Sequence, residues 1–415
     1  MRLVKVRMVM SLVALIIMMG GVCAQQYETP PVTRSAATIL PAEVLSGPHY
    51  RIEDTVVSFG YQHHFTVTSE FGVFEVTGDA ALRKMLREIH AIAELDKLKK
   101  GEEFAKAIAR AGTAPVYFAK DLIVQPVDTV TGIPKGLFRM FSNVGTALNT
   151  HKDPSQDSAA ESILMMSGKK REYAAKLGVD PYSSNTVLQK ELNSVSWAAA
   201  TGGLTVAAAL APFSGPGVLA LKLTRFAASL NDMLAQEPPQ RLRQINSQKL
   251  SAMGIPDDLR QQFLDHAHFT PRHDTILVAA LDELKDARGR DAFVTLALGA
   301  EDEVDANFFT QMAELLRGYH ETVAPITEIT VRPPMVLAKT AKGPVLMPLP
   351  LDHGVWTERA AHLIPTVLAN AKGGGFTGPY ELWVTGTLSS MAQEKLQGLG
   401  VKAVQHVDQR LVFMD

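Results

Sequence analysis

The chain has 415 residues, of which 46% are hydrophobic, 20% charged and 7% aromatic, and its formal net charge is −2. These values exclude a disordered, fibrous or many-span membrane protein and are typical of a globular one. The short basic runs at 97–100 and 169–171 are flanked by acidic residues, so we expect no nucleic-acid partner. The single cysteine, Cys23, excludes an internal disulfide and a cysteine-ligated zinc site.

Residues 1–24 have the pattern of a signal peptide. Three basic residues precede an uncharged apolar run, Met8 to Val22, and small residues then precede a predicted cut between Ala24 and Gln25. We therefore expect a periplasmic or secreted protein. A lipid anchor on Cys23 is the less favoured alternative, because the residues before it lack the leucine of a lipoprotein signal.

Residues 25–45 are rich in proline and small polar residues, which predicts a flexible spacer. From 46 to 78, hydrophobic and polar residues alternate, as at Phe65 and Val67, which predicts a small antiparallel β meander. Because a sheet of a few short strands is not stable alone, we expect the meander to pack on the helices that follow. The neighbouring His63 and His64 would lie on opposite strand faces and could share a site only with groups from elsewhere.

Residues 79–325 are predicted to form a helical domain, beginning with an apolar stripe behind Asp79 as N-cap. A Gly-Val-Asp-Pro segment at 178–181 ends one helix, and Asn185 can cap the next. The segment from Leu192 to Leu221 carries no charge. We interpret it as a buried helical hairpin, and membrane insertion is the less favoured alternative because Pro212 and Pro216 interrupt it.

Residues 326–415 alternate between strand-like and helix-like segments, which predicts a small α/β unit. The expected strands are Met335–Ala338, Val345–Leu349, Tyr380–Val384 and Val401–Val404, and the expected helices are 356–370 and 390–397. The predicted fold class is therefore α+β and mostly helical, with a small N-terminal β meander, a central helical domain and a C-terminal α/β unit.

The densest group of possible metal ligands is His266, His268, His273 and Asp274. However, Thr270 followed by Pro271 is typical of a helix N-terminus, which would place His273 and Asp274 in the first helical turn. The spacing of these residues matches no known set of metal ligands, so we favour a structural role at the start of a helix over a metal site.

The candidate catalytic residues are Asp352, His353 and Glu358, which follow a predicted strand and precede a helix. No serine elbow, P-loop or H-E-x-x-H motif completes a mechanism, so a hydrolase would need a third residue from the helical domain. The glycines at 373–378 match G-x-G-x-x-G, but they follow a helix and lead into a strand, so no cofactor is expected.

Several segments resemble an uncharacterised family of exported proteobacterial proteins. They are Lys170-Arg171-Glu172-Tyr173, the segment from Leu177 to Ser183, Trp197, Leu349-Pro350-Leu351-Asp352 and Trp356-Thr357-Glu358. The resemblance implies export and a shared fold, but no activity, cofactor or catalytic residue.

Three hypotheses follow. The favoured one is a non-catalytic cell-envelope protein that binds an envelope protein or a small molecule. The alternatives are a periplasmic hydrolase-like enzyme that uses Asp352 and His353, and a membrane-inserting protein that uses the segment from Leu192 to Leu221. Membrane contact is the less favoured expectation.

Overall fold

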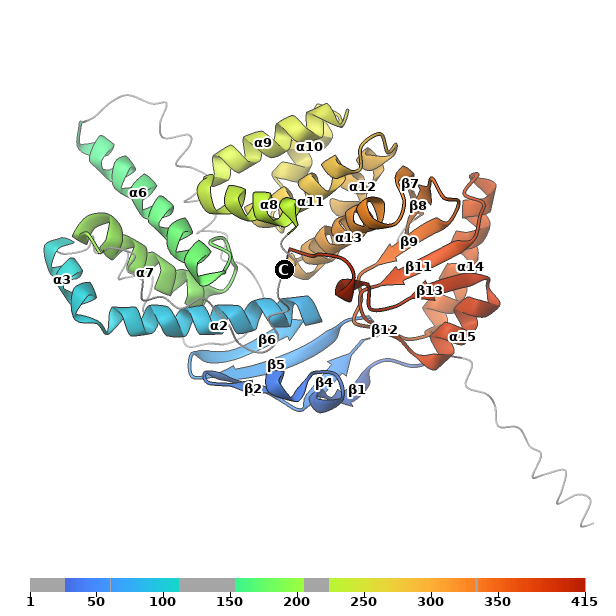
Figure 1. Cartoon of the computed structure of the whole chain (residues 1–415), viewed down its shortest axis with the longest axis horizontal. Helices are drawn as coiled ribbons and strands as arrows, with labels where there is room; N and C mark the ends of the chain where they lie inside the picture. The colour runs from blue at the N-terminus through green and yellow to red at the C-terminus, as the bar shows by residue number, and fades with distance from the viewer. Residues whose placement is uncertain (1–26, 60, 112–153, 205–223, 333–334, 415) are drawn as a thin grey trace, which may run out of the picture.

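The computed structural model describes residues 27–59, 61–111, 154–204, 224–332 and 335–414 (Figure 1). Within these ranges the chain forms an N-terminal sheet, a series of helices, and a C-terminal sheet flanked by helices. The predicted α+β class is confirmed. The predicted signal peptide, with its cut between Ala24 and Gln25 and with Cys23, lies outside the described residues.

The N-terminal sheet is antiparallel and is built around β5. Strand β6 pairs along one side of β5, β3 and β4 pair along the other, and β2 and β1 extend the sheet from β3 and β4. The strands are β1 (Val32–Ser35), β2 (Ser46–Gly47), β3 (Tyr50–Ile52), β4 (Thr55–Ser58), β5 (His63–Ser69) and β6 (Gly72–Thr77). The inward side chains of β5 and β6, such as Phe65 and Val76, are buried against Leu82 and Ile89 of the long helix α2 (Asp79–Lys99). The sheet is therefore stabilised by packing on a helix, as expected for so few strands.

The prediction of a flexible spacer over 25–45 was wrong where the structure describes it. Strand β1 pairs with β4, and the short helices η1 (Ala36–Thr38) and η2 (Ala42–Val44) bury Ala36 and Val44 in the sheet's core. Further toward the N-terminus, the Glu28 carboxylate accepts hydrogen bonds from the Trp356 N–H and the Ser389 hydroxyl, both at 2.6 Å. The prolines that suggested a spacer separate short folded elements instead.

The first group of helices shares a core with the far end of α2. It contains α3 (Glu102–Ala111), α6 (Pro154–Leu177) and α7 (Thr186–Gly202), and the buried residues include Leu95, Tyr173 and Leu192. As predicted, Asn185 caps α7 by accepting hydrogen bonds from two backbone N–H groups. The uncharged segment from Leu192 begins inside α7, where it is buried, but residues 205–221 lie outside the described part of the chain. A hairpin is therefore neither confirmed nor contradicted.

A second group of helices lies beside the C-terminal sheet, and its members α12 and α13 contact the sheet directly. Its members are α8 (Arg225–Gln236), α9 (Pro239–Ala252), α10 (Asp257–Leu264), α11 (Pro271–Glu283), α12 (Arg290–Ala297) and α13 (Glu303–Thr322). The sheet has the order β13-β11-β9-β8-β7, with parallel pairing from β9 to β13 and antiparallel pairing from β7 to β9. These strands are β7 (Ile326–Arg332), β8 (Met335–Thr340), β9 (Val345–Leu349), β11 (Tyr380–Val384) and β13 (Val401–Val404).

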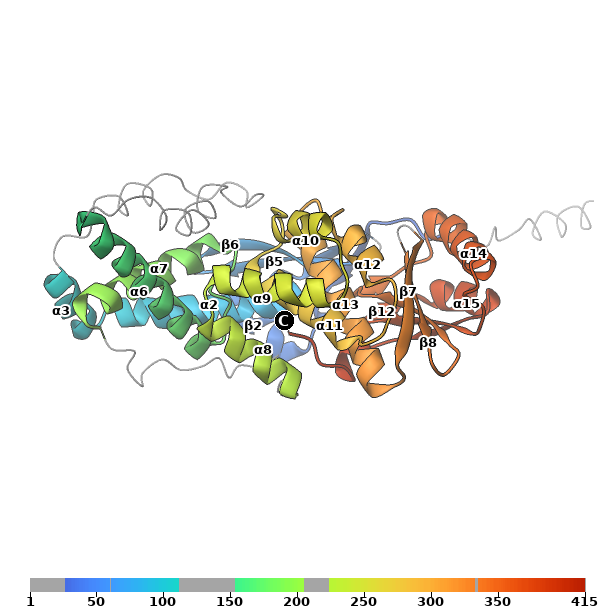
Figure 2. The same ribbon diagram turned by 90° about the horizontal axis from the view of Figure 1, so that it is seen from above.

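The other face of this sheet is covered by α14 (Glu358–Gly373) and α15 (Ser390–Gly398). Figures 1 and 2 show the sheet between these two helices on one side and α11 to α13 on the other. Along β9, Leu346 is buried in the core shared with α11–α13, whereas Val345 and Met347 are buried in the core shared with α14 and α15. The C-terminal region is thus a three-layer α/β/α arrangement.

The predicted boundary at residue 325 does not separate two cores. One hydrophobic cluster contains Leu277 and Leu316 of the helices together with Ile329, Leu346 and Trp383 of the strands. The helical segment 79–325 is instead divided between this core and the one shared by α2, α3, α6 and α7. Residues 224–414 therefore include one folding unit that joins helices and sheet.

Candidate functional site

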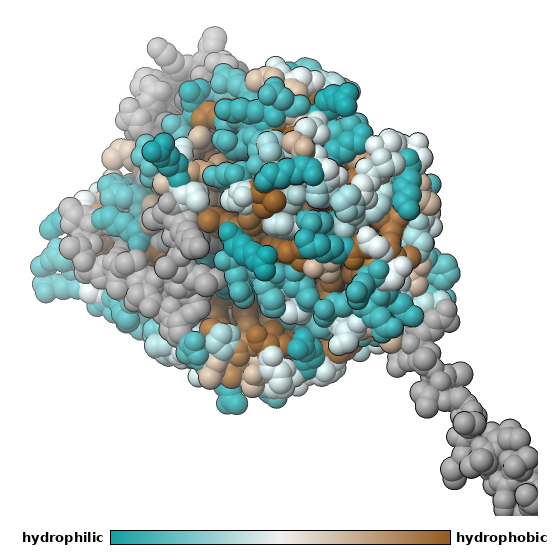
Figure 3. Space-filling view, turned by 45° about the vertical axis from the view of Figure 1, so that its right-hand side comes forward, coloured by the Kyte–Doolittle hydropathy of each residue, from teal (hydrophilic) through white to brown (hydrophobic). Residues whose placement is uncertain are grey.

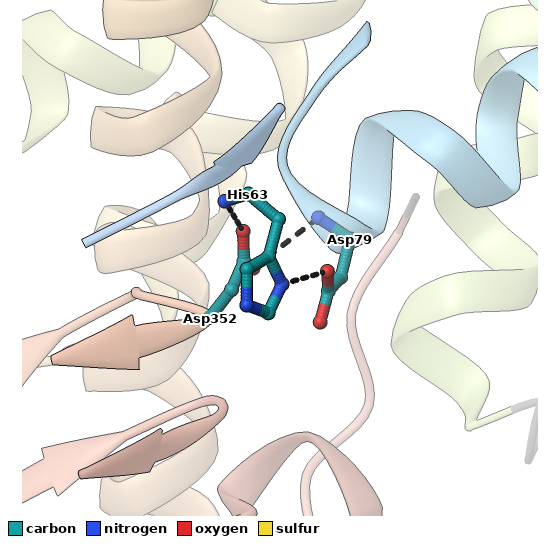
Figure 4. Close-up of side chains that lie close together, drawn as sticks. All are labelled: His63, Asp79 and Asp352. Carbon is teal, nitrogen blue, oxygen red and sulfur yellow. Dashed lines mark hydrogen bonds and ion pairs between the residues drawn. The ribbon is translucent and has the colours of Figure 1, made fainter. Parts of the chain in front are cut away.

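Three distant segments meet where the N-terminal sheet contacts the C-terminal sheet. They are the start of β5 with His63, the first turn of α2 with Asp79, and the loop between β9 and β10 (His353–Gly354) with Asp352. Figure 4 shows the imidazole of His63 lying between the carboxylates of Asp79 and Asp352. In sequence, Asp352 is 289 residues away from His63.

Asp352 acts as the N-terminal cap of helix α2. Its carboxylate accepts hydrogen bonds from the backbone N–H of His63, at 2.9 Å, and from the backbone N–H of Asp79, at 3.2 Å. The N-cap position belongs to Gly78, whose φ of +99° favours glycine and which has no side chain to cap the helix. The prediction that Asp79 is the N-cap was therefore wrong, because Asp79 is already helical and a carboxylate from the C-terminal region replaces the cap.

His63 is the most buried member of the site. Its side chain is 3% exposed, and its Nδ1 atom lies 2.8 Å from the Asp79 carboxylate. Its second ring nitrogen, Nε2, is buried and has no hydrogen-bond partner among the described residues. The ring stacks on His353, with 6.4 Å between ring centres, and the Nδ1 atom of His353 lies 2.7 Å from the hydroxyl of Thr387 in β12 (Thr387–Leu388).

The site perturbs the titration of the buried carboxyl group. Burial, followed by the neighbouring charge of Asp79, raises the pKa of Asp352 to about 7 against the opposing effect of the two backbone hydrogen bonds. Burial also lowers the pKa of His353, because the protonated imidazole loses hydration. A carboxyl group of this kind can exchange a proton near neutral pH.

Beside these residues is a recess of about 30 Å³, lined by Asp79, Ala80, Arg83, Gln311, Asp352, Thr385, Gly386, Asp408 and Phe413. The backbones of two of its walls pack closely, because a Cβ atom on Gly386 would lie 2.0 Å from the backbone oxygen of Asp352. No residue other than glycine fits at position 386 without a shift of the backbone. Ligand pockets for organic molecules usually measure several hundred Å³, whereas this volume is that of one water molecule or ion. The recess therefore admits no organic substrate as it stands.

The structure brings only part of the predicted catalytic set together. Asp352 and His353 are both at the site, but His353 pairs with Thr387, and Glu358 lies exposed in the first turn of α14. The partners that sequence reasoning missed are His63 and Asp79. The inward position of His63 on its strand was the available signal, but only the fold shows which groups face it.

The predicted metal group at 266–274 has structural roles, as the favoured reading stated. Thr270 and His273 form a capping box at the start of α11, and His266 Nε2 lies 3.1 Å from the backbone oxygen of Leu298. His268 donates its backbone N–H to the ring of His266, and Asp274 lies in the first turn of α11. Across the described ranges, the one set of three donors within reach of a single ion is that of His63, Asp79 and Asp352.

A larger concavity lies on the far side of the C-terminal sheet. This α14–α15 groove has a volume of about 510 Å³ and is lined by Tyr27, Trp356, Ala361, His362, Pro365, Glu394, Lys395, Gly398 and Leu399. Leu399, at its edge, is 37% exposed. No feature of the sequence marked this groove, because its walls come from three separate segments.

Comparison with protein-family models, with curated proteins and with solved structures finds no match to this chain. Among the helices that the structure describes, none is both long enough and apolar enough to cross a membrane. Figure 3 shows the surface of one face, on which hydrophobic residues reach solvent in separate areas between hydrophilic ones.

Proposed function

We propose that this chain is an exported, non-catalytic protein of the bacterial cell envelope that binds a partner or an envelope component in the α14–α15 groove. Export is supported by the basic residues, apolar run and small residues of positions 1–24. Binding is supported by the groove, whose volume of about 510 Å³ lies in the usual range of ligand sites.

A non-catalytic function is supported by the difference in volume between the recess beside Asp352 and the α14–α15 groove. The titratable residues surround a recess of about 30 Å³, whereas the groove has room for a ligand. A reacting group must lie within hydrogen-bond reach of the acid or base that acts on it. Since Asp352 also caps α2, its position serves the docking of the two sheets.

The groove favours a ligand with an apolar group and a polar end. Tyr27, Trp356 and Pro365 provide apolar walls, while Glu394 and Lys395 bring charges of both signs to one side. Apolar pockets with a few convergent polar groups are typical of ligand sites. A peptide side chain of a partner protein, or a small amphipathic molecule, has this chemistry.

The hydrolase-like alternative has one observation in its favour. His63 and Asp79 form a buried histidine–aspartate pair, and Asp352 lies beside them with its pKa near neutrality. Such pairs orient imidazole bases in many enzymes. This function requires the recess to open, because its present volume excludes an organic substrate.

Export is tested by expressing the full chain in a proteobacterial host and measuring the mass of the product in each cell fraction. We expect a chain that begins at Gln25 in the periplasm or medium. Leu15→Arg, which places a charge in the apolar run, should leave the chain uncut in the cytosol. The same change at Val73, which is 48% exposed in β6, is the matched control and should leave export intact. An uncut wild-type chain among soluble cytosolic proteins would contradict the proposal.

Binding is tested with a photo-crosslinking residue placed at Leu399 and, as a control, at Val73. We expect a defined crosslinked product from envelope fractions with the probe at Leu399 and none with the probe at Val73, because only the first lies at the groove. His362→Trp, which fills the groove, should remove that product. Equal crosslinking from both positions would argue against the groove as the binding site.

A further inference from the structure

We propose that His63, Asp79 and Asp352 bind one zinc-like divalent metal ion, which joins the N-terminal sheet, helix α2 and the C-terminal sheet. The ion would have a structural role and would add to the cap that Asp352 already provides. This inference is independent of export and of the groove, since it rests on the contact between the two sheets.

The donor atoms have the right chemistry and are close to one another. One imidazole nitrogen and one oxygen from each carboxylate all lie within 4.8 Å of one another. One nitrogen and two oxygen donors suit a borderline transition-metal ion such as Zn²⁺. Ligands at zinc bond lengths in a tetrahedron are about 3.4 Å apart, so the side chains need to close by about 1 Å.

The charges around the recess also favour a divalent cation. The carboxylates of Asp79, Asp352 and Asp408 line it together with one guanidinium group, that of Arg83. Three carboxyl groups beside one guanidinium group repel one another when they are ionised, because the site holds little water. A bound ion of charge +2 would balance them.

Two buried atoms at the site have no hydrogen-bond partner among the described residues. They are Nε2 of His63, whose side chain is 3% exposed, and Oδ1 of Asp408. Buried polar atoms are nearly always paired, so the unpaired oxygen of Asp408, which lines the recess, indicates that a bound group completes the site there. Asp408 is not one of the three donors, and its free oxygen can accept a hydrogen bond from a water molecule in the fourth position of the ion.

Binding would replace the hydrogen bond between His63 and Asp79. A neutral imidazole binds a metal through Nδ1 only when its ring proton is on Nε2, so binding would place that proton on Nε2 and free Nδ1 and the Asp79 carboxylate, now 2.8 Å apart, for the ion. The two sheets would then be joined by metal–ligand bonds as well as by the backbone contacts of Tyr61, whose oxygen accepts from the N–H of Asp352 at 2.8 Å. The recess holds about one further small group, which fits a water ligand but no substrate.

The experiment uses the purified full-length mature protein, stripped with EDTA and titrated with ZnCl₂ by calorimetry and thermal unfolding. We expect one equivalent of Zn²⁺ to bind and the Tm to rise by about 5 °C when free zinc exceeds the Kd a hundredfold. Mg²⁺ should give a much smaller shift, because it prefers six oxygen ligands. Absence of stoichiometric zinc binding would overturn the proposal.

Variants locate the ion. Asp79→Asn and Asp352→Asn keep the side-chain shapes but remove the charged ligands, and each should abolish the zinc shift while the protein stays folded in EDTA, as checked by near-UV circular dichroism. Asp408→Asn should weaken binding about tenfold, as expected of a group that contacts a ligand of the ion. The matched control is the double variant of His266→Gln and His268→Gln, which should bind zinc normally.

A zinc shift that survives in both aspartate variants, or that disappears in the histidine control, would place the ion elsewhere and overturn the proposal. If the aspartate variants are unfolded in EDTA, the visible spectrum of the Co²⁺-loaded wild-type protein decides instead. Tetrahedral absorption would support the site, and a spectrum of octahedral hydrated cobalt would overturn it.

Discussion

Trp383→Ala is expected to lower the free energy of unfolding by about 3 to 5 kcal/mol. Helices α11 to α13 and the C-terminal sheet should still unfold together, in one transition. Trp383 is on β11, is 7% exposed, and contacts Tyr319 of α13 edge to face with 4.8 Å between ring centres. Its removal leaves a cavity between the helical layer and the sheet, where neither layer can close the gap alone.

The measurement is hydrogen exchange followed by mass spectrometry at increasing urea concentration. Peptides from α11 and from β8 should lose protection together in both the wild type and the variant, and at lower urea in the variant. Leu399→Ala, a truncation at the edge of the α14–α15 groove, is the control and should cost less than about 1 kcal/mol. Loss of protection in the strands alone would show that residue 325 does separate two independent domains.

The sequence pattern predicted the elements of the C-terminal region closely, but not their partners. Four of the five strands and both helices lie within a few residues of the expected positions. Strand β7 was missed, because Pro325 was read as a boundary and Ile326–Arg332 was not recognised as a strand. Periodicity shows which face of an element is apolar, but the apolar face of α13 does not indicate that a sheet covers it.

The site was predicted in part for the same reason. Asp352 and His353 stood out because they follow a strand, whereas His63 was expected only to lie on the opposite strand face from His64. The sequence contains no local sign that these residues meet, since 289 positions separate Asp352 from His63. The N-cap of α11 at Thr270 was predicted, because the residues that signal a helix start are neighbours in the sequence.

The second large effect concerns the pH dependence of stability, measured in EDTA so that no metal ion contributes. From pH 5 to pH 8 the wild type is expected to lose stability that Asp352→Asn retains, because only the wild type has the titrating carboxyl group. Asparagine is uncharged, as protonated aspartic acid is, but its amide nitrogen cannot accept a hydrogen bond. The N–H groups of His63 and Asp79 are bound to different oxygens of Asp352, so one of them loses its acceptor in the variant, at a cost that is the same at both pH values.

The sign follows from the two pKa values of Asp352, about 7 in the folded protein and 3.8 as its ordinary value. Between these values the folded state binds the proton more tightly than the unfolded state, so stability falls as pH rises. The effect is at most about 1.4 kcal/mol per pH unit, or about 2 to 3 kcal/mol between pH 5 and pH 8. Urea unfolding of both proteins at these two pH values measures it.

The control is Glu358→Gln, which removes an exposed carboxylate from the first turn of α14 and should shift the stability by less than about 1 kcal/mol at either pH. Asp352→Ala should be less stable than Asp352→Asn at both pH values. It leaves the buried N–H groups of His63 and Asp79 without an acceptor, which costs about 1 to 3 kcal/mol for each group. Equal pH profiles for the wild type and Asp352→Asn would mean that the carboxyl group is ionised in the folded protein across this range. The junction of the two sheets would then hold a full negative charge balanced by other groups.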